Sequence, residues 1–158
     1  MKTLIKQKGQ SLIEAIVALS AAVLIISAIA VAVLTSVGNS DYSKNQNKAT
    51  LYAQEELESL RESSEISWSN FSSQGSGIYC VGSNEVLESS VSNCSTANLD
   101  NYYIRQVDLY DFNTSGCTNS RKVRVSVFWS DGKCQSGQFC HNVVLESCFA
   151  DNNTLPTP

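Results

Sequence analysis

Residues 10–37 read QSLIEAIVALSAAVLIISAIAVAVLTSV, a long apolar run with a single carboxylate, Glu14, near its start. The twenty residues from Ala15 to Leu34 carry no formal charge. At about 1.5 Å per residue, a helix of that length spans about 30 Å, which is the thickness of the hydrocarbon core of a bilayer. A carboxylate at the edge of such a segment is costly in lipid. The sequence therefore predicts a transmembrane helix that carries one charged residue, Glu14, for which we expect a functional reason.

The segment before this run, MKTLIKQKG, is a short basic leader that contains Lys2, Lys6 and Lys8. Lysines on one flank favour a cytoplasmic N-terminus. The apolar run is too long for the core of a secretory signal peptide, and TSVGNSDYS after it offers no clear small-residue cleavage site. We therefore expect a single-pass membrane protein with its N-terminus in the cytoplasm and the rest of the chain outside.

The arrangement KGQSLIEAIVAL resembles the N-terminus of the type IV pilin-like family, the prepilins and type II secretion pseudopilins. In that family a membrane peptidase cuts after a glycine, the new N-terminus is usually methylated, and the fifth mature residue is a glutamate. The resemblance implies that residues 1–9 are a cleaved leader ending at Gly9, and that Gln10 becomes the N-terminus. Glu14 is then the fifth mature residue. The first mature residue is commonly Phe or Met, so Gln10 departs from the family pattern and leaves its methylation open.

Cleavage would leave a free ammonium at Gln10, four residues from Glu14. In a growing filament, the ammonium of a neighbouring subunit can approach Glu14 and neutralise it. Because an unpaired buried charge is strongly destabilising, this pairing would favour the correct register of assembly. The alternative is that Glu14 only reaches the membrane interface as a tolerated polar residue. The resemblance implies the membrane, a prepilin peptidase and other pilin-like subunits as partners. It also implies a location in the cytoplasmic (inner) membrane with the N-terminus inside, followed by an extracytoplasmic or cell-surface filament.

The helix is expected to continue as an amphipathic extension over residues 38–65, with Gly38 as a possible bend. Apolar positions recur at three- and four-residue steps and form one stripe: Ala49, Tyr52, Ala53, Leu57 and Leu60. The opposite side is acidic: Glu55, Glu56, Glu58 and Glu62. LYAQEELESLRES looks like the matching stretch of minor pilins and minor pseudopilins, and Val31 stands where major pilins often carry a proline. Both features favour a minor subunit.

Residues 66–150 are expected to form a β-rich globular head, followed by a disordered tail at 151–158. The clearest strand is 121–129, where Val123, Val125, Val127 and Trp129 alternate with more polar residues. Further strands are expected at 102–110 and 138–147, with a connecting loop over 67–84. VSVFWSDG and VVLES resemble the last hairpin of minor pilins. The predicted fold is α+β: a long N-terminal helix packed on a small antiparallel sheet.

Six cysteines follow the apolar run, and an even number in a small exported domain indicates disulfides. Fifteen pairings are possible. If Trp129 lies opposite residues near Phe139, Cys148 falls close to Cys117, and Cys134 and Cys140 flank the turn. The pairs expected on this basis are Cys80–Cys94, Cys117–Cys148 and Cys134–Cys140.

Signs of catalysis or cofactor binding are weak. There is no Cys-x-x-Cys pair and His141 is the single histidine, so no zinc site is expected. His141 adjoins Cys140, but neighbours in a strand point to opposite faces, which argues against a Cys-His catalytic pair. Neither a cofactor nor an enzymatic activity is expected.

Charge also argues against direct DNA binding, because loss of the leader lowers the formal net charge from −4 to −7. The local basic cluster Arg121, Lys122 and Arg124 reads as a solvated face of a strand. The leading hypothesis is a structural filament subunit. The alternatives are an uncleaved, membrane-anchored extracellular binding module and an anchored extracytoplasmic enzyme.

Overall fold

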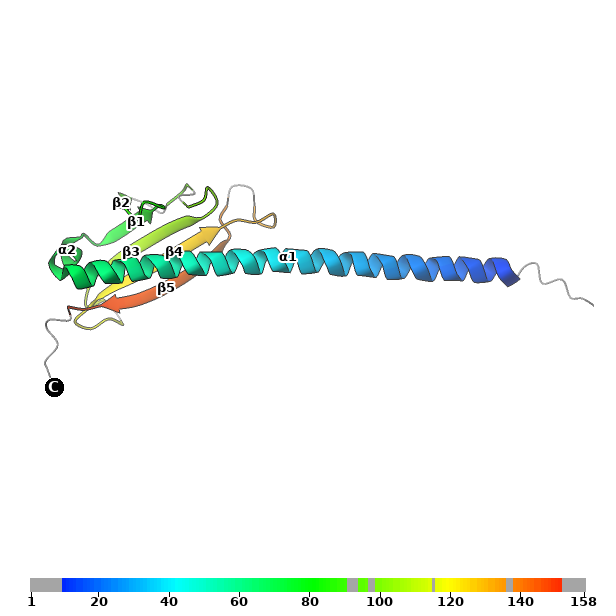
Figure 1. Ribbon diagram of the computed structural model, residues 1–158, viewed down its shortest axis with the longest axis horizontal. Coiled ribbons are helices and arrows are strands. Elements are labelled where there is room, and N and C mark those ends of the chain that lie inside the picture. The colour runs from blue at the N-terminus through cyan, green and yellow to red at the C-terminus, as the bar shows by residue number, and fades with distance from the viewer. Residues whose placement is uncertain (1–9, 91–93, 97–98, 115, 136–137, 152–158) are drawn as a thin grey trace, which may run out of the picture. The chain divides into compact units, whose positions relative to one another are not determined.

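The structure, a computed structural model, describes residues 10–90, 94–96, 99–114, 116–135 and 138–151. Gly9, where we expect the leader to end, and all but the first residue of the expected tail lie outside this description. The chain divides into two units, 1–42 and 43–158. One helix, α1 (Gln10–Ile66), begins in the first unit and ends in the second. Figure 1 labels the elements.

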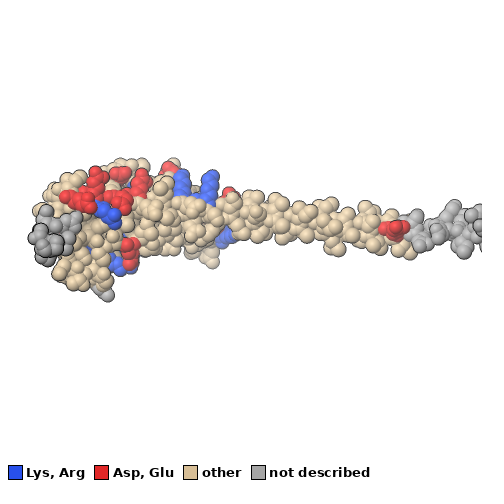
Figure 2. Space-filling model, turned by 60° about the horizontal axis from the view of Figure 1, so that its bottom comes forward, with Lys and Arg blue, Asp and Glu red and all other residues tan. Residues whose placement is uncertain are grey.

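The first unit consists of the N-terminal part of α1. Gly38, considered above as a possible bend, is helical like its neighbours, so α1 is not interrupted there. All described side chains from Leu12 to Val37 are exposed, including Leu24 at 72%. Figure 2 shows this stretch without Lys, Arg, Asp or Glu apart from one acidic side chain near its start. The described stretch from Leu12 to Val37 therefore has a mainly apolar surface and no buried side chain.

The second unit packs the last part of α1 against a five-stranded antiparallel sheet (Figure 1). Ala49 and Ala53 are fully buried and Leu60 is nearly so. Tyr52 and Leu57 are partly buried against the same core, which confirms the apolar stripe. Small residues at 49 and 53 let the helix backbone approach the sheet closely, and Leu60 fills the core further along.

The sheet has the strand order β2-β1-β3-β4-β5, and every neighbouring pair is antiparallel. Its strands are β1 (Gly77–Val81), β2 (Leu87–Ser90), β3 (Ile104–Phe112), β4 (Arg121–Trp129) and β5 (His141–Phe149). The expected alternation in β4 is confirmed, because Val123, Val125, Val127 and Trp129 are buried on the core side. The α+β layout is thus the observed one.

The sequence predicts a connecting loop over residues 67–84, but the structure shows more than a loop there. These residues contain the short helix α2 (Trp68–Ser73) and strand β1. Ser67 caps α2 by accepting a hydrogen bond from the Asn70 amide at 3.4 Å, and Phe71 is buried in the core. Ser and Gly in this stretch therefore act as cap and turn residues between short elements.

Three disulfides fasten the second unit: Cys80–Cys94, Cys117–Cys148 and Cys134–Cys140. These are the same pairs that the hairpin argument gives. The register differs by two residues, because Trp129 lies opposite His141 and not opposite Phe139. Cys148 consequently lies opposite Lys122, still close enough to reach Cys117 with a Cα–Cα distance of 5.6 Å.

Two charged residues assigned to the surface are in fact buried. Glu56 is 1% exposed although it belongs to the predicted acidic side of the helix, and Arg121 is 2% exposed although it belongs to the predicted basic cluster. Arg121 donates to the carbonyl oxygens of Tyr110 and Phe71, each at 3.0 Å. Its role is to join β3 and α2 to β4, and burial lowers its pKa.

Candidate functional site

The N-terminal part of α1 is the first candidate site. Among the described residues, α1 is the one helix that is long and apolar enough to cross a membrane by length and composition. Gln10 is its first residue, and Glu14 is exposed on it. Exposed aliphatic side chains surround Glu14 along the helix, including Ile13 at 66% and Val17 at 59%. Such a surface is stable in lipid or against other apolar helices, but not in water.

A buried ion pair connects α1 to the sheet in the second unit. Arg105 of β3 lies 3.2 Å from Glu56 through Nη2, and both side chains are 2% exposed. Arg105 also donates to the carbonyl oxygens of Gly82 at 2.7 Å and Val81 at 3.4 Å. Burial raises the pKa of Glu56, and Arg105 opposes that rise. Because both side chains are buried between α1 and the sheet, we interpret the pair as a structural contact.

A second polar cluster joins the same helix to the loop before β3. Lys48 Nζ lies 2.7 Å from Asp100 Oδ2, and the Tyr52 hydroxyl also donates to Asp100. Hydrogen bonds from Lys48 and then Tyr52 lower the pKa of Asp100, and the bond to Asp100 is the main cause that raises the pKa of Lys48. Both charged side chains are about half exposed, so this cluster contributes little to stability.

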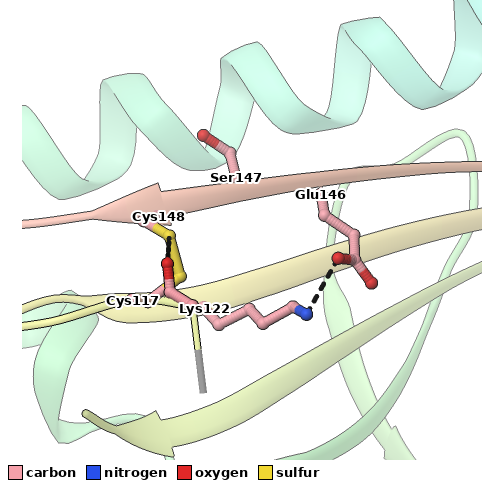
Figure 3. Close-up of a pocket in the computed structure, with 6 residues that line it drawn as sticks. Cys117, Lys122, Glu146, Ser147 and Cys148 are labelled. Carbon is pink, nitrogen blue, oxygen red and sulfur yellow. Dashed lines mark hydrogen bonds and ion pairs between the residues drawn. A yellow bond between two sulfur atoms is a disulfide. The ribbon is translucent and has the colours of Figure 1, made fainter. Parts of the chain in front are cut away.

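An open pocket lies beside the Cys117–Cys148 disulfide (Figure 3). Its volume is about 260 Å³, and Lys122 and Glu146 line it. Glu146 accepts from Lys122 at 2.8 Å and from Arg124 at 2.6 Å, and these bonds lower its pKa. The volume is below the range usual for small-molecule sites, about 300–1,000 Å³. Two of the three cations of the basic cluster, Lys122 and Arg124, are therefore paired with a carboxylate, and the pocket gives no evidence of a ligand.

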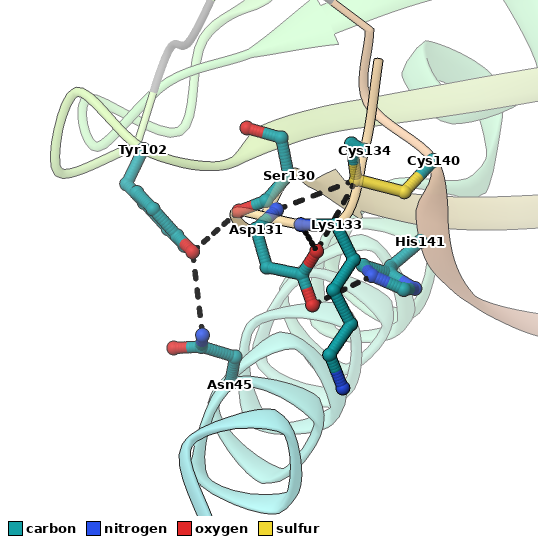
Figure 4. Close-up of a disulfide and its surroundings, with 8 residues drawn as sticks. All are labelled: Asn45, Tyr102, Ser130, Asp131, Lys133, Cys134, Cys140 and His141. Atoms are coloured by element: carbon teal, nitrogen blue, oxygen red, sulfur yellow. Dashed lines mark hydrogen bonds and ion pairs between the residues drawn. A yellow bond between two sulfur atoms is a disulfide. The ribbon is translucent and has the colours of Figure 1, made fainter. Parts of the chain in front are cut away.

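Within the described residues, the turn between β4 and β5 brings together four side chains of the types that can hold a metal ion (Figure 4). Asp131, Cys134, Cys140 and His141 each place one potential ligand atom within 4.8 Å of all the others. His141 Nε2 lies 3.1 Å from Asp131 Oδ2, and the Asp131 amide donates to Cys134 Sγ at 3.3 Å. A hydrogen bond from the Lys133 amide is the main cause that lowers the pKa of Asp131.

This group was not predicted from the sequence. Cys140 and His141 were expected to be strand neighbours on opposite faces, but β5 begins at His141 and Cys140 lies before it. Cys140 is therefore free of the strand's alternation, and its sulfur lies near the His141 ring. The signal was present in residues 131–141, DGKCQSGQFCH, which bring four ligand-type side chains into eleven residues.

The fold and these sites define a class: an α+β protein with one N-terminal helix suited to a membrane and a disulfide-bonded head, which is typical of an oxidising, extracytoplasmic location. Comparison with family models, with curated proteins and with solved structures finds no match to this chain.

Proposed function

We propose that this chain is a structural subunit of a type IV pilus-like or type II secretion filament, cut by a prepilin peptidase after Gly9 and assembled through its N-terminal helix. The observation that carries the proposal is the contrast within α1. Its second part is buried against a sheet, whereas described side chains of residues 12–37 are exposed and almost wholly apolar. A helix with this surface needs lipid before assembly and other helices afterwards.

Glu14 supports assembly over simple anchoring. It is the one charged residue between Gln10 and Val37. A plain membrane anchor gains nothing from a carboxylate there, since burying it costs free energy. In a filament, the N-terminal ammonium of a neighbouring subunit would neutralise Glu14, so the charge would favour one register of packing. Gln10 and Val31 favour a minor subunit within the filament.

The first experiment measures the intact mass of the chain purified from membranes of its native host. Processing after Gly9 predicts a mass lower by nine residues than that of the full chain. Recovery of the uncut chain would overturn processing and would favour the membrane-anchored binding module.

The second experiment compares Glu14→Ala with Glu62→Ala, which changes an exposed glutamate in the second unit. Sheared filaments are probed for each variant, alongside the amount of processed chain in the membrane. We expect Glu14→Ala to reduce incorporation at least about tenfold, because one unpaired ammonium would remain in the packed helices. Glu62→Ala should incorporate like the unmodified chain. Equal incorporation of all three would contradict the proposed role of Glu14.

A further inference from the structure

The β4–β5 turn gathers a carboxylate, two sulfurs and an imidazole at one point of the head (Figure 4). Asp131 and Cys134 come from the turn after β4, and Cys140 and His141 come from the entry to β5. These are the ligand types that tetrahedral zinc sites use. The cluster has no part in the proposed assembly through α1.

The four ligand atoms lie within 4.8 Å of one another, which approaches the spacing of a zinc site. Zinc bonds of about 2.0–2.3 Å in a tetrahedron place ligand atoms about 3.3–3.8 Å apart. Asp131 Oδ2 lies 3.1 Å from His141 Nε2, and the other oxygen of the same carboxylate, Oδ1, lies 3.6 Å from Cys134 Sγ. The sulfurs are joined in the Cys134–Cys140 disulfide. Reduction would let the sulfurs separate to ligand spacing, and the other ligand atoms would need to approach one another by about 1 Å.

Contacts independent of the disulfide hold the two other ligands in place. The His141 ring packs against the buried Trp129, its register partner across the hairpin, with ring centroids 5.4 Å apart. The Asp131 side chain accepts a hydrogen bond from the Lys133 amide at 2.8 Å. Opening the disulfide would therefore leave the carboxylate and the imidazole positioned toward the same point.

This disulfide is also well suited to being opened. Cys134 and Cys140 are six residues apart, against 14 and 31 for the other two pairs, so it closes the shortest loop. Stabilisation by a cross-link falls as the closed loop becomes shorter, so the head loses least when this one is cut. Cys140 is exposed, as is Cys148 of the Cys117–Cys148 pair, and exposed disulfides are those most open to attack by a reductant, so loop length is what distinguishes Cys134–Cys140 from that pair.

We propose that reduction of Cys134–Cys140 converts the β4–β5 turn into a zinc site with Asp131, Cys134, Cys140 and His141 as ligands. A dithiol reductant supplies two electrons and two protons, breaks the S–S bond and becomes a disulfide itself. Zn²⁺ then displaces the two thiol protons and forms two zinc–thiolate bonds. In the oxidised chain the sulfurs are not available as thiolates, so this form should not bind zinc at the turn.

The test uses the full chain in detergent, reduced without oxygen by a water-soluble phosphine, which becomes a phosphine oxide with oxygen from water. Alkylation and mass mapping identify which disulfide has opened. Co²⁺ alone is then titrated as a spectroscopic substitute for Zn²⁺. We expect one equivalent of Co²⁺ to give the thiolate charge-transfer band and the intense visible bands of a tetrahedral site, and Zn²⁺ to displace it. The oxidised chain should give neither band.

Variants separate this site from binding by other thiols. Cys134→Ser/Cys140→Ser should lose the Co²⁺ bands, whereas the control Cys80→Ser/Cys94→Ser should keep them at one equivalent. His141→Ala and Asp131→Ala should each weaken Zn²⁺ binding by more than about tenfold in competition with a chelator. Circular dichroism of each oxidised variant checks that the head is folded, and His141→Gln replaces His141→Ala if it is not.

The proposal is overturned if the reduced chain gives no charge-transfer band. It is also overturned if the band survives Cys134→Ser/Cys140→Ser, or if folded variants at 131 and 141 bind Zn²⁺ as tightly as the unmodified chain.

Discussion

Two glutamates on the same helix have opposite environments. Glu14 lies in the first part of α1 among exposed aliphatic side chains, whereas Glu56 lies in the second part, 1% exposed and beside Arg105. Each is a carboxylate in an apolar setting, where an unpaired charge is costly. Glu56 pairs with Arg105, which belongs to the same unit. For Glu14, we propose that the cation belongs to another subunit.

The two parts of α1 also differ in how their apolar surface is covered. Ala49, Ala53 and Leu60 are buried by the sheet, so the second part of the helix belongs to a core. The first part has no core of its own, and Leu24 is 72% exposed. One helix thus combines a segment that stabilises the head with a segment whose stability depends on its surroundings. Substitutions in the two parts should therefore have different consequences.

The largest effect on the head is expected from Glu56→Ala. The change leaves the Arg105 guanidinium buried without its carboxylate partner, apart from Glu55 at 3.9 Å. Removing one member of a buried ion pair costs about 3–5 kcal/mol of the free energy of unfolding. Urea unfolding followed by tryptophan fluorescence measures this in the head, because both tryptophans, Trp68 and Trp129, lie in the second unit.

The matched control for this change is Glu58→Ala. Glu58 pairs with Arg61 at 3.3 Å, and its side chain is 65% exposed. Its loss should change the free energy of unfolding by no more than about 0.5 kcal/mol. Equal losses for the two variants would mean that burial of Glu56 is not what makes its pair important.

A somewhat smaller effect should follow from Leu60→Ala, paired with Leu24→Ala on the same helix. Leu60 is 4% exposed in the core, so its truncation should lower the free energy of unfolding of the head by about 2–4 kcal/mol. Leu24→Ala should leave the urea midpoint unchanged within error, since no core side chain covers it. A loss of head stability in Leu24→Ala would contradict the division of α1 into two environments.

Patterns that repeat along the sequence predicted most of the fold. The charge-free run and the 49–60 stripe located α1, and strict alternation in 121–129 located β4 with its observed limits. The same hairpin placed Cys148 near Cys117, and a two-residue error in register did not change the pairing. These features depend on local periodicity, which the sequence displays directly.

Features that depend on distant partners were missed. Glu56 and Arg121 look like surface residues because the groups that satisfy them, Arg105 and the Phe71 carbonyl, are 49 and 50 residues away. Strands β1 and β2 have five and four residues, too short for a periodic signal. The cluster around Cys140 was missed because predicting it requires knowing the exact residue at which β5 begins. Gly9 lies outside the described residues, so processing there stays a prediction.

The smallest effect concerns an exposed charge network that contrasts with the buried Glu56 pair. Bonds from Lys122 and Arg124 lower the pKa of Glu146 below its ordinary value of 4.5. Such a carboxylate adds stability above pH 4.5, and this contribution is lost as the pH falls through the lower pKa of the folded state. Urea midpoints of Glu146→Gln should thus lie below those of the unmodified chain at pH 7, and the gap should close in acid.

A double-mutant comparison identifies the source of that pH dependence. In a Lys122→Gln/Arg124→Gln background, Glu146→Gln should have an effect that no longer fades as the pH is lowered, because the cations that shift the carboxylate are gone. If the gap still closes in acid, another group causes it. Glu56 should behave in the opposite sense, since burial raises its pKa. The free energy of unfolding of the head should therefore fall as the pH rises through the raised pKa of Glu56. The sign of the pH dependence thus distinguishes Glu146, whose pKa is lowered by surface pairing, from Glu56, whose pKa is raised by burial.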